Sequence, residues 1–151
     1  MERRDFIAKA GIISTALALN ITHMETKNIV SKKSTLGVKE TTDKFEGILT
    51  QKGITVYARI NQQAEAAKAG IALKGIEFLL FGNPGKGGRV MAENPQAALD
   101  LPLKLLVWED AQNQTWISYN DPASLVERFS LAGQTTKLID IEPLVTLLLQ
   151  E

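Results

Sequence analysis

The sequence contains no cysteine and a single histidine, His23, among its 151 residues. Without cysteine the chain can form no disulfide, no thiolate zinc site and no cysteine nucleophile. Because His23 precedes the expected domain, that domain also lacks a histidine-based catalytic triad. Transition metals favour imidazole and thiolate ligands, so we expect no bound metal and no cofactor. Carboxylates, lysines, hydroxyls and backbone amides remain for any chemistry.

The sequence also has no excess of either charge, because it contains 17 basic and 17 acidic residues. Removal of residues 1–18 leaves 14 basic and 15 acidic residues. Binding to nucleic acid or anionic lipid depends on clustered, uncompensated cations, so we expect no nucleic-acid partner. The chain is 44% hydrophobic and 23% charged, which is typical of one globular domain of this length.

The N-terminal residues have the arrangement of an export signal. Arg3 and Arg4 precede an apolar stretch, and Ala16-Leu17-Ala18 is a small-x-small cleavage pattern. The charged start resembles the twin-arginine signal. The apolar segment from Phe6 to Leu19 is shorter than the ~20 residues of a membrane-spanning helix. We expect a signal peptide over residues 1–18 and a periplasmic or otherwise exported protein with no stable membrane anchor after cleavage. An amphipathic N-terminal helix is the alternative.

Hydrophobic periodicity predicts alternating strands and helices after a polar tether at residues 19–28. The expected strands cover residues 29–36, 54–60, 76–81, 103–108 and 115–120. The expected helices cover residues 39–52, 61–70, 89–99 in two pieces and 121–129, with a last helix capped by Asp140. This order predicts a single α+β domain over residues 29–151, with two layers, a mixed β-sheet and helices mainly on one face.

Four sequence blocks carry a resemblance to a known family. They run from Phe81 to Pro84, from Ala98 to Lys104, from Val107 to Asp110 and from Ser118 to Pro122. Together they closely resemble the family called domain of unknown function 302, over about residues 29–131. The resemblance implies a compact α+β domain that is commonly dimeric and has no established activity.

Two positions depart from that family. Its relatives of this subtype tend to carry Asp-His where this chain has Asn61-Gln62, and Arg-His where it has Arg128-Phe129. A function that depends on those histidines in relatives therefore does not carry over to this chain.

A glycine-rich segment is the first candidate binding site. Residues 82–88 read GNPGKGG between an expected strand and an expected helix, and we interpret them as a loop. Exposed backbone N–H groups and a lysine side chain could bind a small anion there. The candidate ligand-binding residues are Gly82, Asn83, Gly85, Lys86 and Gly87, together with Asp100 and Lys104 if the two segments share one pocket. The alternative is a tight turn whose glycines supply a positive φ.

Asp100 and Lys104 form the second candidate, at the start of an expected strand. A carboxylate and an amine could act as a general acid–base pair if burial moved their pKa values. Alternatively, Asp100 caps the preceding turn and Lys104 is an exposed strand residue. A metal-independent enzyme built on this pair is the alternative to a ligand-binding function.

Aromatic residues mark an expected hairpin. Trp108, Trp116 and Tyr119 lie on its two strands, where aromatic cross-strand pairs add roughly 0.5–1 kcal/mol of stability. The last helix carries Leu147 and Leu149 beyond its apolar face, which favours self-association. We therefore expect a ligand-binding or interaction module that acts as a homodimer. A structural protein without any small-molecule site is a third possibility.

Overall fold

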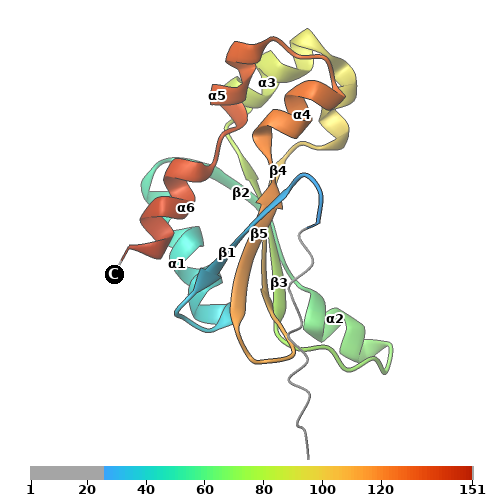
Figure 1. The fold of residues 1–151 in the computed structure, drawn as a ribbon, viewed down its shortest axis with the longest axis vertical. Coiled ribbons are helices and arrows are strands. Elements are labelled where there is room, and N and C mark those ends of the chain that lie inside the picture. Colours follow the sequence, from blue (N-terminus) through green and yellow to red (C-terminus); the bar gives the residue numbers. More distant parts are fainter. Residues whose placement is uncertain (1–25, 151) are drawn as a thin grey trace, which may run out of the picture.

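The computed structural model describes residues 26–150 (Figure 1). The expected signal peptide at residues 1–18 and most of the expected tether lie outside the described residues. Within residues 26–150, no helix is long and apolar enough to cross a membrane.

Five strands form one sheet in the order β1-β5-β4-β3-β2. The strands are β1 (Ile29–Ser34), β2 (Thr55–Asn61), β3 (Ile76–Gly82), β4 (Leu103–Glu109) and β5 (Thr115–Asn120). The α+β class is confirmed. A mixture of parallel and antiparallel pairs was expected, but all four pairings are antiparallel.

The connections explain the antiparallel order. Helix α2 (Gln62–Lys68) joins β2 to β3 and has seven residues, which span only about 10 Å. After α2 and residues 69–75 the chain re-enters the sheet at the end where β2 stopped, so β3 runs antiparallel to β2. The long connection from β1 to β2 passes through α1 (Val38–Gln51) and leaves these two strands at opposite edges of the sheet.

The interpretation of residues 82–88 as a loop was wrong, because helix α3 (Pro84–Glu93) already begins there. The Asn83 side-chain oxygen accepts a hydrogen bond from the Lys86 backbone N–H at 3.1 Å, and Pro84 occupies the first helical turn. Both are standard features of a helix start. A 3₁₀ helix, η1 (Pro95–Leu99), follows, which agrees with the expected break before Pro95.

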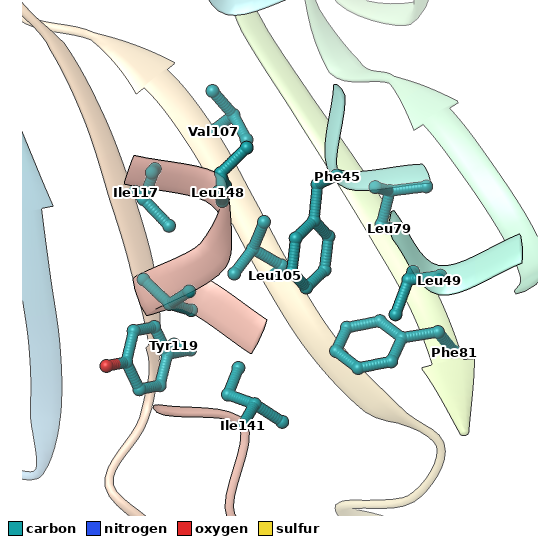
Figure 2. Packing of buried hydrophobic residues seen from close by; sticks show 11 residues of the cluster. Phe45, Leu49, Leu79, Phe81, Leu105, Val107, Ile117, Tyr119, Ile141 and Leu148 are labelled. Carbon is teal, nitrogen blue, oxygen red and sulfur yellow. The ribbon is translucent and has the colours of Figure 1, made fainter. Parts of the chain in front are cut away.

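Helices α1 and α6 (Glu142–Leu149) form the expected layer on one face of the sheet (Figure 1). Their apolar side chains meet the inward-facing residues of β3, β4 and β5 (Figure 2). Phe45 of α1 packs edge-on against Phe81 of β3, with ring centroids 5.3 Å apart. This main core also contains Leu49, Leu79, Leu105, Val107, Ile117, Tyr119, Ile141, Val145 and Leu148.

A second, smaller core lies among the helices beyond one end of the sheet (Figure 1). Helix α3, helix α4 (Pro122–Arg128) and helix α5 (Thr136–Ile139) surround it. Its buried residues are Val90, Ala97, Leu125, Phe129, Leu131 and Ile139. Helix α5 and the 3₁₀ turn η2 (Gly133–Thr135) before it were not predicted from the sequence.

Candidate functional site

A cavity of about 160 Å³ opens where β3 ends and α3 begins. Four of the candidate residues line it, namely Gly82, Asn83, Lys86 and Gly87, whereas Gly85 does not. Most of the remaining wall is apolar and includes Met91, Leu101, Pro102, Leu103, Leu138 and Ile139. The cavity therefore lies at the junction of the two cores, between α3, the η1–β4 connection and α5.

The glycines around this cavity are not turn residues. Positive φ angles occur at Gly53 and Gly70, which end α1 and α2, with φ of 67° and 77°. Among the described glycines, Gly82 and Gly87 show no such angle. A Cβ at Gly87 would meet nothing within 4 Å, and one at Gly82 would approach only the Tyr57 ring, at 3.7 Å. The missing side chains thus leave open space beside the cavity.

A groove of about 420 Å³ adjoins the cavity on the side of α6. The two spaces are adjacent, because both are lined by Gly82, Asn83, Lys86, Leu103 and Leu138. The groove extends from the start of α3 to the α5–α6 connection. Further lining residues are Lys52, Ile54, Phe81, Lys137, Asp140 and Ile141. Sequence reasoning missed Lys52 and Lys137, because no local pattern connects them with the glycine-rich segment.

Asp100 and Lys104 line neither of these spaces. The Asp100 Oδ2 accepts a hydrogen bond from Arg128 Nη1 at 2.9 Å, and Lys104 Nζ donates to the Pro102 carbonyl oxygen at 2.9 Å. Burial lowers the pKa of Lys104, and the nearby Asp100 carboxylate opposes that shift. The pair shares a cavity of only about 10 Å³, which is about the space of one water molecule.

The outward face of the sheet carries the hairpin tryptophans. Trp108 and Trp116 stack with ring centroids 6.3 Å apart and planes inclined by 21°. Tyr119, by contrast, belongs to the main core on the other face, where its hydroxyl donates a hydrogen bond to Glu142. An open groove of about 390 Å³ lies beside Trp108 and is lined by Phe78, Leu106, Ser118 and Lys104. The sequence predicted the aromatic pair but not the separation of Tyr119 from it.

The two positions that depart from the family pattern have structural roles. The Asn61 side-chain oxygen accepts a hydrogen bond from the Ala64 backbone N–H at 2.8 Å and so caps α2. Phe129 is buried in the second core. Among residues 26–150, no cluster of three or more His, Cys, Asp or Glu side chains could hold a metal ion.

Comparison with known proteins gives a family and a fold. The model of the family described as "Domain of unknown function DUF302" matches residues 30–142. A crystal structure of an uncharacterized conserved protein of that family from Bacillus stearothermophilus is similar, with a TM-score of 0.69 at 24% identity. The similarity covers 82% of this chain and 97% of that one and supports the fold.

Curated relatives match over a shorter segment. Two proteins named "Fluoride-specific ion channel FluC 1", from Brucella suis biovar 1 and Brucella abortus biovar 1, are each 36% identical over 103 residues. The match covers 68% of this chain but only 41% and 38% of those proteins. The chain thus spans about two fifths of the length of the curated relatives it matches.

Proposed function

Since the chain belongs to the DUF302 family, whose description gives no activity, we propose from its geometry that it is a small-molecule-binding module. The observation that carries the proposal is the cavity between β3 and α3, with its apolar wall and its polar edge at Asn83 and Lys86. Ligand sites are typically concave and mostly apolar, with a few polar groups that orient the ligand.

The size and charge of this site limit the ligand. A cavity of about 150 Å³ in another protein holds benzene, so a space of about 160 Å³ suits a group of about six carbons. Lys86 adds a positive charge, and the start of α3 favours negative charge. The module therefore suits a ligand with a small apolar part and an anionic group.

The enzyme alternative has less support. Asp100 is already paired with Arg128, and Lys104 already donates to the Pro102 carbonyl oxygen. Their shared space of about 10 Å³ leaves no room for a substrate beside both groups. Because Asp100 does not line the β3–α3 cavity, we expect Asp100→Asn to leave binding there unchanged.

A role connected with fluoride is a second candidate. It comes from the names of the curated relatives, which this chain matches along about two fifths of their length. Fluoride is a small anion, and Lys86 at the cavity edge is compatible with it. The experiment that tests ligand binding, described below, therefore includes sodium fluoride as a second probe.

Export and dimerisation belong to the same proposal. Arg3 and Arg4 support the twin-arginine route, and the family resemblance supports a homodimer. Of the two leucines that suggested α6 as the interface, Leu147 is 37% exposed but Leu149 packs on the main core. The outward face of the sheet carries the half-buried Phe78 and Leu106 beside an open groove. We therefore place the proposed dimer contact there.

Binding is tested with 1-hexanol as the probe and two matched leucine substitutions. A Cβ at Gly87 or at Gly88 meets nothing within 4 Å, and both residues lie in α3, but only Gly87 lines the cavity. Both changes remove the roughly 1 kcal/mol helix penalty of glycine. We expect Gly87→Leu to fill the cavity and abolish hexanol binding, and Gly88→Leu to retain it.

NMR titration of the wild type and both variants gives the readout, with sodium fluoride against sodium chloride at equal ionic strength in a parallel arm. Hexanol should shift the resonances of Leu101 and Leu138, which lie in the cavity wall. Shifts caused by fluoride alone would favour the second candidate. No shift with any probe would contradict the binding proposal.

A further inference from the structure

Most lysines of residues 26–150 have a partner for their ammonium group. Seven of them contact a carboxylate, an amide or backbone oxygen, or the Trp116 ring. Four have no hydrogen-bond, ion-pair or ring partner among the described residues, and these are Lys27, Lys52, Lys86 and Lys137.

Three of these four unpaired lysines line the same groove. Lys52 follows α1, Lys86 lies in the first turn of α3 and Lys137 lies in α5, yet all three border the 420 Å³ groove. Asp140 is the one acidic residue in its lining, and its Oδ1 accepts a hydrogen bond from the Glu142 backbone N–H at 2.9 Å. Three cations against one anion concentrate positive charge in a domain that is otherwise close to neutral.

The groove and the cavity differ in character but lie side by side. Lys86 and Leu138 line both, while Met91, Leu101 and Ile139 line only the apolar cavity. Unpaired cations thus gather next to a space that suits about six carbons. This arrangement is complementary to a molecule with an apolar tail and an anionic head.

We propose that the ligand is an amphipathic organic carboxylate, with its tail in the β3–α3 cavity and its head among Lys52, Lys86 and Lys137. The inference rests on the proposed small-molecule-binding function and names the class of ligand for that site. The tail supplies affinity because each buried methylene tightens binding about fourfold. The head supplies selectivity because a charge-assisted hydrogen bond is lost when either partner becomes neutral.

The experiment compares acetate, butanoate, hexanoate and 1-hexanol by isothermal titration calorimetry on residues 19–151. Affinity should rise from acetate to hexanoate, and hexanoate should bind at least about tenfold more tightly than 1-hexanol. Lys52→Ala and Lys137→Ala change residues that line only the groove and should each weaken hexanoate and leave 1-hexanol unchanged. Lys86→Ala should weaken hexanoate more than it weakens 1-hexanol. Lys27→Ala removes the fourth unpaired lysine, which lines neither space, and should change neither affinity.

The outcomes separate the two levels of the proposal. Equal affinity for hexanoate and 1-hexanol would overturn the carboxylate inference and keep the small-molecule site. Acetate binding as tightly as hexanoate would overturn the assignment of the tail to the cavity. A loss with Lys27→Ala as large as with Lys86→Ala would reduce the effect to net charge and overturn the inference. If neither six-carbon probe binds, both the inference and the proposed function fail.

Discussion

Arg59 on β2 and Glu77 on β3 form an ion pair across the edge of the sheet. Nε of Arg59 donates a hydrogen bond to Oε2 of Glu77 at 2.7 Å, and Nη2 lies 2.6 Å from the same oxygen. The Glu77 side chain is only 8% exposed. Nη1 of Arg59 also reaches Asp43 at 2.6 Å and Glu46 at 2.9 Å. One side chain therefore ties the edge strand to its neighbour and to α1.

Removal of Arg59 should be strongly destabilising. Arg59→Met leaves the Glu77 carboxylate buried without its partner, and breaking a buried ion pair in this way costs about 3–5 kcal/mol. Replacement of both residues by methionine should recover most of the loss, because no unpaired buried charge remains. Urea unfolding of the two variants measures both effects.

The exposed ion pair between Arg128 and Asp100 provides the control. The Arg128 side chain is 61% exposed, so Arg128→Met should cost at most about 1 kcal/mol. If Arg59→Met cost no more than Arg128→Met, the proposed structural role of the Arg59–Glu77 pair would be wrong.

Local patterns in the sequence predicted most of the elements. Alternation over Ile54–Ile60 and the apolar run at Ile76–Phe81 predicted β2 and β3, and the helix expected over residues 61–70 is α2. These signals act over a few residues, so one sequence is enough to find them.

The errors have physical reasons. The four glycines that follow Phe81 led to the prediction of a loop. The Asn83-Pro84 pair, however, was the signal that a helix begins there. Strand direction depends on where each connection re-enters the sheet, which no local pattern records. The second core and the groove lined by Lys52, Lys86 and Lys137 bring together α3, α5 and the end of α1 from distant parts of the chain. Candidate residues could therefore be named from the sequence, but their partners could not.

Export through the twin-arginine route depends on the arginine pair. A fusion of residues 1–25 to a folded reporter should appear in the periplasm, and Arg3→Lys combined with Arg4→Lys should stop it. Lys9→Arg is the control, because it conserves a positive charge at a position outside the arginine pair and should leave export unchanged. Fractionation of cells that express each fusion gives the result. A reporter that stays in the cytoplasm with the native leader would contradict the proposal.

Dimerisation through the outward face of the sheet predicts different effects for two leucines. Leu106 lies opposite Phe78 on β3 and Ser118 on β5, so it is central on that face. Leu106→Asp places a charge in the proposed contact and should yield a monomer in light scattering at high micromolar concentration, where we expect the wild type to be a dimer. Leu147→Asp introduces the same charge on α6, where the side chain is 37% exposed, and should leave the dimer intact. Circular dichroism checks that both variants fold. A dimer that persists in folded Leu106→Asp but dissociates in Leu147→Asp would instead place the contact on α6, and a monomeric wild type would contradict self-association.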